Sequence, residues 1–100
     1  MSISTLNPAT GELVRSYTQY SPERVNEVLD AAAGAQREWA HVAVAQRAAA
    51  MAPLAALLRS RVEEYATLMT VEMGKPIAQA RAEILKCATC ADHFAEHGAG

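Results

Sequence analysis

The sequence is poor in cysteine and aromatic residues, and it lacks long apolar runs. Its 100 residues include two cysteines and five aromatic residues, counting Trp, Tyr and Phe. Two cysteines close together cannot form a disulfide framework, so we expect the reducing cytoplasm as the compartment. The apolar runs are far shorter than the roughly 20 residues of a membrane span. Residues 1–5 also lack the basic and apolar regions of a secretory signal. These absences predict no membrane contact.

The sequence also has no large excess or continuous run of charges of one sign. Nine basic and eleven acidic residues leave a formal net charge of −2, and they form no basic stripe of the kind that nucleic-acid-binding proteins carry. Apolar residues make up 51% of the chain, but 22 of them are alanine. Few large side chains therefore remain for a core, and a chain this short buries only about two-thirds of its unfolded surface. The composition is typical of a thin helical layer. It predicts that the chain has no nucleic-acid partner.

The first residues predict a β-hairpin. The turn signal is Asn7-Pro8-Ala9-Thr10-Gly11, in which proline sets its own φ and the final glycine tolerates a positive φ. The flanking segments, 3–6 and 12–17, are rich in the β-branched and aromatic residues typical of strands. We therefore divide the chain into an N-terminal hairpin segment, residues 1–20, and a helical part, residues 21–100.

The helical part predicts about four amphipathic helices, so the segment is expected to be mainly α. Its first helix begins at Ser21-Pro22-Glu23, which combines a capping serine, a proline at the first helical position and an acid in the first turn. Apolar residues then recur at the spacing of one buried stripe. The expected helices span about 22–39, 43–59, 60–73 and 76–96.

Proline and glycine mark the breaks between these helices. Inside a helix, Pro53 would cost about 3 kcal/mol, so the second helix either kinks there or ends near Ala52 and restarts with proline in its first turn. Ser60 and Glu63 match a capping box at the start of the third helix. Gly74, followed two residues later by proline, matches the end of that helix.

Cys87 and Cys90 form a CxxC pair within the last predicted helix. Redox pairs of this kind lie at helix N-termini, where the helix dipole lowers the thiol pKa, whereas this pair is mid-helix. Cys87 falls on the apolar stripe, so we expect it to be a buried small apolar residue, with Cys90 at the edge of the stripe. His93 and His97 extend the series, but one straight helix cannot surround a tetrahedral ion. A solvated helix face is therefore favoured over a metal site.

Three motifs occur in a fixed order along the chain. They are Thr5-Leu6-Asn7-Pro8-Ala9-Thr10-Gly11-Glu12, Ala35-Gln36-Arg37-Glu38-Trp39 and Glu72-Met73-Gly74-Lys75-Pro76. Together they resemble the N-terminal part of the NAD(P)-dependent aldehyde dehydrogenase superfamily. Residues 74–83 and 94–98 are most similar to the succinate-semialdehyde dehydrogenase branch. The resemblance covers essentially the whole chain, and the end at Gly100 looks like a cut through a continuing chain.

The resemblance implies a longer α/β enzyme with a Rossmann-like cofactor domain, to which residues 21–100 would contribute helices. In that family a cysteine thiolate attacks a small aldehyde, NAD or NADP accepts hydride, and a glutamate-activated water releases the acid. The subunits are expected to form a homo-oligomer. The family's nucleophile, base and cofactor loops all lie beyond Gly100. The resemblance therefore implies no catalytic and no cofactor-binding residue in this chain, and no activity or bound cofactor for residues 1–100 alone.

One ancillary site is implied by the resemblance. Some family members bind a monovalent cation through backbone oxygens that match Thr5 and Leu6 and through an acid that matches Glu72. Backbone carbonyls with one carboxylate suit a hard cation. The alternative is that Glu72 only caps a helix or pairs locally on the surface.

A second function class remains open from the residues. The chain could be a self-contained helical interaction module whose amphipathic faces dock a partner, with no catalytic activity. The motifs at 5–12 and 72–76 favour the enzyme segment, whereas a stop codon directly after Gly100 would favour the module.

Overall fold

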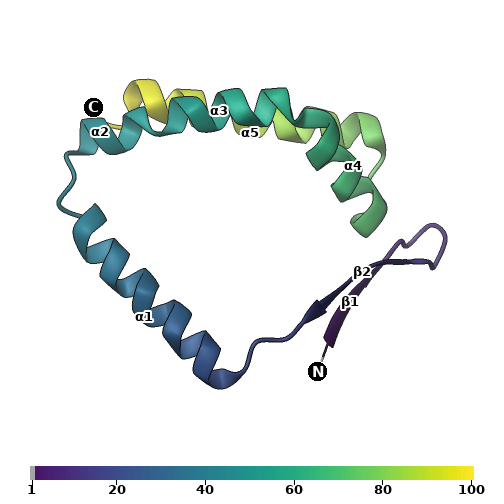
Figure 1. Cartoon of the computed structure of the whole chain (residues 1–100). Helices are drawn as coiled ribbons and strands as arrows, with labels where there is room; N and C mark the ends of the chain where they lie inside the picture. Colours follow the sequence, from purple (N-terminus) through teal and green to yellow (C-terminus); the bar gives the residue numbers. More distant parts are fainter. Residues whose placement is uncertain (1) are drawn as a thin grey trace.

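The computed structural model describes residues 2–100 and consists of a hairpin followed by helices in a flat, open arrangement (Figure 1). Its principal extents are 47 × 40 × 16 Å. The elements are β1 (Ser2–Leu6), β2 (Leu13–Thr18), α1 (Pro22–Trp39), α2 (Val44–Ala49), α3 (Met51–Ser60), α4 (Val62–Met73) and α5 (Ile77–His97). The prediction of a mainly helical segment with an N-terminal hairpin is confirmed. The predicted hairpin segment started at residue 1, which lies outside the described residues.

The hairpin is held by its antiparallel ladder and by its turn. Pairing runs from Ser2 opposite Thr18 to Leu6 opposite Leu13, with an irregularity between Thr5 and Leu6. In the turn, the Asn7 Oδ1 atom accepts a hydrogen bond from the backbone N–H of residue 9 at 2.9 Å, and the N–H of residue 11 donates to the Asn7 carbonyl at 2.7 Å. The asparagine therefore shapes the turn that the sequence signal predicts.

Helix α1 begins as predicted but stands apart from the other helices (Figure 1). The Ser21 Oγ atom accepts a hydrogen bond from the backbone N–H of Arg24 at 3.2 Å, and Pro22 occupies the first helical position. No residue of α1 is buried. Its apolar stripe, which includes Val28 and Leu29, is exposed. The stripe is present, but it meets no apolar surface among residues 2–100.

The second predicted helix is divided at Ala50, where α2 ends and α3 begins. Pro53 lies in the first turn of α3. Backbone N–H groups of a first turn have no partner within the helix, so proline removes no hydrogen bond there. The restart with proline in the first turn is therefore the alternative that the structure supports.

The predicted capping box at Ser60 is wrong. Ser60 is the last residue of α3, and its hydroxyl donates a hydrogen bond to the backbone carbonyl of Leu57 at 3.0 Å. Arg61 takes the N-cap position of α4, and it makes no side-chain capping bond. Serine can bond back to a carbonyl of the preceding turn, and this competing bond keeps Ser60 in α3. Gly74 ends α4 with a φ of 74°, as predicted.

Helix α5 packs lengthwise against α3 and α4 and forms the helical layer of the molecule. Alanine supplies the contact surface, because the buried residues are Ala48, Ala55, Ala66, Ala80, Ala88 and Ala91. Small side chains let helix backbones approach closely. Dispersion contacts between the helices therefore stabilise this layer without large buried side chains. Met51 and Leu58 flank the central cluster of this layer.

The expectation that Cys87 is buried is also wrong: both cysteines are exposed in residues 2–100. The buried side of α5 is centred on Ala80, Ala88 and Ala91. At 100° per residue, Cys87 lies at the edge of that side rather than at its centre. The apolar stripe read from the sequence was wider than the surface that α3 and α4 cover.

No single helix within residues 2–100 combines the length and apolarity that crossing a membrane requires. Only α1 and residues 44–60 taken together have the required length and apolarity, and these two helical segments are bent by 119° relative to each other.

Candidate cation site

The hairpin meets the helices at the C-terminal end of α4, and this junction unites two of the predicted cation ligands. The Thr5 hydroxyl donates a hydrogen bond to Oε1 of Glu72 at 3.1 Å, across 67 positions of sequence. Both side chains are partly buried. Leu6, the third predicted residue, follows Thr5 directly at the end of β1.

Thr5 lies in the regular part of the ladder, opposite Arg15 of β2. The register shifts directly after Thr5, where Leu6 pairs with Leu13 and Val14 of β2 is the extra residue of a bulge. The Thr5 hydroxyl also lies 3.4 Å from the backbone carbonyl of Arg15. A hydroxyl has only one hydrogen to donate. The carboxylate of Glu72 is both closer and the stronger acceptor, so the bond to α4 takes precedence.

A second contact joins the same two segments beside the hydrogen bond. Gly74 terminates α4 in the left-handed conformation, two residues after Glu72. A Cβ atom at Gly74 would lie 3.1 Å from Cγ of Pro8 in the hairpin turn. Glycine is therefore favoured here by its positive φ, and an added Cβ atom would press against the proline ring.

The Glu72 carboxylate bonds to the Thr5 hydroxyl, while basic residues near it pair with other acids. Lys75, the basic residue nearest to it in sequence, forms an ion pair with Glu83 of α5. Glu63, at the other end of α4, pairs with Arg81 of α5 through two hydrogen bonds of 2.7 and 3.1 Å. This bidentate contact holds the pKa of the Glu63 carboxyl below, and that of the Arg81 guanidinium above, their ordinary values.

The donor atoms at the junction suit an alkali cation. Glu72 supplies a carboxylate and Thr5 a hydroxyl, the backbone carbonyls of residues 5–6 are the further ligands that the sequence predicts, and hard cations prefer such oxygen ligands. Within residues 2–100, no group of three or more His, Cys, Asp or Glu side chains is arranged to hold a metal ion. A site with one carboxylate and backbone oxygens differs from such a cluster, so its use as a cation site stays a prediction.

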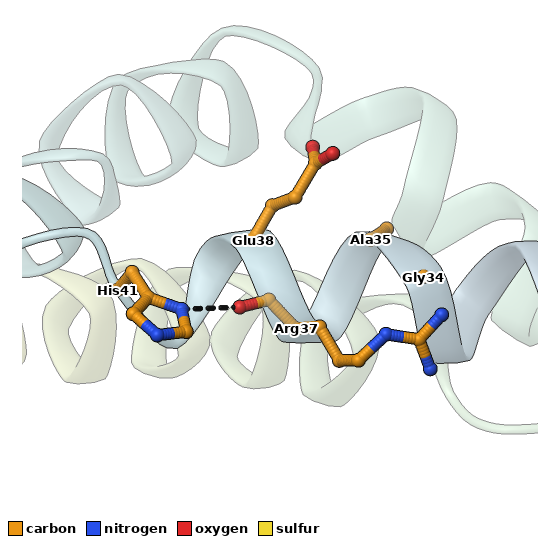
Figure 2. Close-up of a pocket in the computed structure, with 5 residues that line it drawn as sticks. All are labelled: Gly34, Ala35, Arg37, Glu38 and His41. Carbon is orange, nitrogen blue, oxygen red and sulfur yellow. Dashed lines mark hydrogen bonds between the residues drawn. The ribbon is translucent and has the colours of Figure 1, made fainter.

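Two surface hollows within the described residues offer no comparable chemistry. Figure 2 shows the first, which is lined only by α1 and the turn after it: Gly34, Ala35, Arg37, Glu38 and His41. Within it, the Arg37 carbonyl lies 2.7 Å from Nδ1 of His41, and the Arg37 and Glu38 side chains extend away from each other. The second is lined only by α5: Ala82, Glu83, Lys86, Cys87 and Cys90. Neither brings together groups from separate elements.

Comparison with known proteins decides the family. The model of the aldehyde dehydrogenase family matches residues 1–99. The chain belongs to the aldehyde dehydrogenase family. Curated relatives include a probable NADP(+) succinate-semialdehyde dehydrogenase of Synechocystis, 42% identical over 96 residues, and the NAD(P)+ succinate semialdehyde dehydrogenase Sad of Escherichia coli, 40% identical over 94 residues. These alignments cover 96% and 94% of this chain but 21% and 20% of the relatives, so the chain spans about a fifth of their length.

Sequence reasoning missed two features of this junction. It predicted backbone oxygens of Thr5 as ligands, whereas the structure also directs its hydroxyl to Glu72. It treated Pro8 as part of a turn and Gly74 as a helix end, although the two lie close together in the structure. The available signal was that both lie within motifs that carry the family resemblance. The contact between those motifs is a tertiary fact that neither motif reveals alone.

Proposed function

We propose that this chain is the N-terminal part of a longer succinate-semialdehyde dehydrogenase that uses NADP+ or NAD+. The proposal is supported by the family match over residues 1–99 and by relatives of this named activity. The enzyme would oxidise the aldehyde to its carboxylic acid through a cysteine nucleophile located in the remaining sequence. Membership of an enzyme family argues against the alternative of a self-contained interaction module.

The contribution of these 100 residues to that enzyme is structural. A pyrophosphate cradle needs backbone N–H groups at a glycine-rich strand-to-helix loop. The strands β1 and β2 instead form an antiparallel pair joined by a turn. We therefore propose that residues 1–100 alone bind neither NAD+ nor NADP+ measurably and oxidise no aldehyde. Their α3–α5 layer would support the cofactor domain from outside the catalytic centre.

The proposed cation site belongs to the same structural role. Thr5 and Leu6 would bind K+ or Na+ through their carbonyls, and Glu72 would supply the only negative charge. The hydrogen bond between Thr5 and Glu72 is the single observation that carries this assignment, because it brings β1 and α4 together at the predicted ligands. A bound cation would neutralise the carboxylate and join the hairpin to the helical layer.

Location and assembly complete the proposal. We propose a cytoplasmic homo-oligomer that acts on a small aldehyde and has no nucleic-acid or membrane partner. The low cysteine content and the balanced charge support the compartment and the lack of a nucleic-acid partner. Exposed apolar side chains on both strands, including Ile3 and Leu13, support packing of the hairpin against further protein.

The test is to express the complete reading frame and to measure reduction of NADP+ and NAD+ with succinate semialdehyde. We expect turnover by the purified full-length protein and none by purified residues 1–100. Full-length protein in which Cys87 and Cys90 are both replaced by serine is the matched control. It should retain activity within a few-fold, since the proposed nucleophile lies elsewhere. A folded full-length protein that reduces neither cofactor with a panel of aldehydes would contradict the proposal.

A further inference from the structure

We infer that Pro8 and Gly74 are positioning residues that hold Thr5 and Glu72 together at the proposed cation site. The inference rests on that proposed function. Pro8 follows Thr5 by three residues, and Gly74 follows Glu72 by two. A fixed contact between the later pair therefore limits how far the earlier pair can separate. The two residues lie close together, because a Cβ atom added to Gly74 would be 3.1 Å from Cγ of Pro8.

The Thr5–Glu72 hydrogen bond cannot hold the junction together unaided. One hydrogen bond makes a modest net contribution to stability, and ordering a glutamate side chain costs conformational entropy of similar size. The bond therefore needs a framework that already places its two partners. The hairpin turn and the end of α4 provide this framework, because β1 contacts α4 there.

Local hydrogen bonds hold the chain on both sides of the Pro8–Gly74 approach. On the hairpin side, Asn7 donates its backbone N–H to the carbonyl of residue 12 at 2.9 Å, and its side chain accepts from the N–H of residue 9. On the helix side, the N–H of Gly74 donates to the carbonyl of Thr70 at 2.9 Å. Pro8 adds a fixed φ to the turn. The proline ring and the glycine therefore lie on two segments that are each held by their own hydrogen bonds.

The chain contains a matched control for this contact. Gly11 has a φ of 76° and Gly74 a φ of 74°, so alanine strains the backbone equally at both positions. A Cβ atom at Gly11 would have no heavy atom within 4 Å, whereas one at Gly74 would meet Pro8. The difference between Gly74→Ala and Gly11→Ala therefore isolates the contact with Pro8 from the strain of a positive φ.

The experiment compares these variants in the full-length protein. Melting temperatures are measured in K+, Na+ and tetramethylammonium salts at matched ionic strength, and K+ affinity is taken from the rise of melting temperature with K+ concentration. We expect Gly11→Ala to lower the melting temperature equally in all three salts. We expect Gly74→Ala to weaken K+ affinity by about tenfold or more, as loss of a supporting contact around a metal site does. Equal K+ affinities in the two variants would overturn the inference.

Pro8→Ala gives an independent variant, which also serves if Gly74→Ala does not fold. It removes the ring without straining Gly74, and it should weaken K+ affinity in the same direction. The double variant should be no weaker than Gly74→Ala alone, since both changes break one contact. Additive losses would show that the two residues act separately and would overturn the inference.

A final comparison separates this inference from the cation site itself. If the unaltered protein melts identically in all three salts, the proposed cation site is wrong. The positioning role is then judged in tetramethylammonium, by introducing Thr5→Val. This change should lower the melting temperature of Gly11→Ala protein but not of Gly74→Ala protein, in which the Thr5–Glu72 bond is already lost. An equal effect in both backgrounds would refute the positioning role with or without a bound cation.

Discussion

Helices α1 and α5 are similar in length and pattern but differ in packing. They have 18 and 21 residues, and each carries an apolar stripe along one face. Helix α5 buries three alanines against α3 and α4, whereas α1 buries no residue. The exposed stripe of α1 includes Val28, at 42% exposure, and Leu29, at 60%. An amphipathic pattern therefore predicts that a helix has a buried face but does not identify what covers it.

The largest expected loss of stability comes from a change in the buried face of α5. Ala88 is fully buried in the central cluster of the helical layer. Replacing it with leucine would force α3 and α5 apart or strain the inserted side chain, at about 1–3 kcal/mol. Thermal or denaturant unfolding of the full-length protein should show this loss. Thr89→Leu, on the exposed side of the same helix, is the control, and a loss of similar size there would contradict the role given to Ala88.

The next largest effect concerns the exposed apolar stripe of α1. Val28→Ala should change the stability of residues 1–100 by less than about 0.5 kcal/mol, because the side chain packs against no other element there. In the proposed longer enzyme we expect α1 to be covered, and the same change should cost about 1.5 kcal/mol for the two methyl groups removed. Parallel unfolding of the two proteins measures the difference. Equal small effects would mean that the stripe of α1 stays exposed in the longer protein.

A smaller effect concerns the ion pair that joins α4 to α5. Arg81 holds the pKa of Glu63 below its ordinary value of 4.5. A depressed carboxyl pKa stabilises the folded state above the unfolded pKa, and this contribution is lost as the pH falls through the folded pKa. Glu63→Gln should therefore reduce the loss of stability below about pH 4.5, and only slightly, because both groups are solvent-exposed. Glu64→Gln is the control, and acid unfolding curves that shift equally for both variants would contradict this.

The smallest effect concerns the thiols of α5. Both cysteines are exposed in the structure, so in residues 1–100 we expect Cys87 and Cys90 to react with a thiol reagent at rates within a few-fold of each other. Mass spectrometry of the partly labelled, natively folded protein measures the two rates. If Cys87 alone reacted slowly, the labelling would support the buried position that its apolar spacing predicts and contradict its exposure in the structure.

Local chemistry made most of the elements predictable from sequence. The Asn7–Gly11 turn, the Ser21 cap and the left-handed Gly74 each depend on residues within a few positions, and the structure contains all three. The capping box failed for the same local reason, because Ser60 had a competing partner in its own helix. The burial of Cys87 failed for a different reason, since the width of a buried face is set by the neighbouring helices.

The candidate site divides along the same line. A family resemblance was enough to name Thr5, Leu6 and Glu72, because each lies in a short motif. The direction of the Thr5 hydroxyl towards Glu72 and the contact of Pro8 with Gly74 depend on how β1 meets α4. Hydrophobic spacing carries no information about such a junction, since its contacts are polar or involve glycine.

The sequence by itself determined the order of elements, the start of α1, the C-terminal end of α4 and the family, because caps, turns and motifs act through neighbouring residues. Only the tertiary structure decided that alanines rather than large side chains form the contact surface of α5, and that the hairpin turn lies against the end of α4. The physical reason is that both depend on the distance between backbones. That distance is set where separate segments of the chain meet, and no single segment contains it.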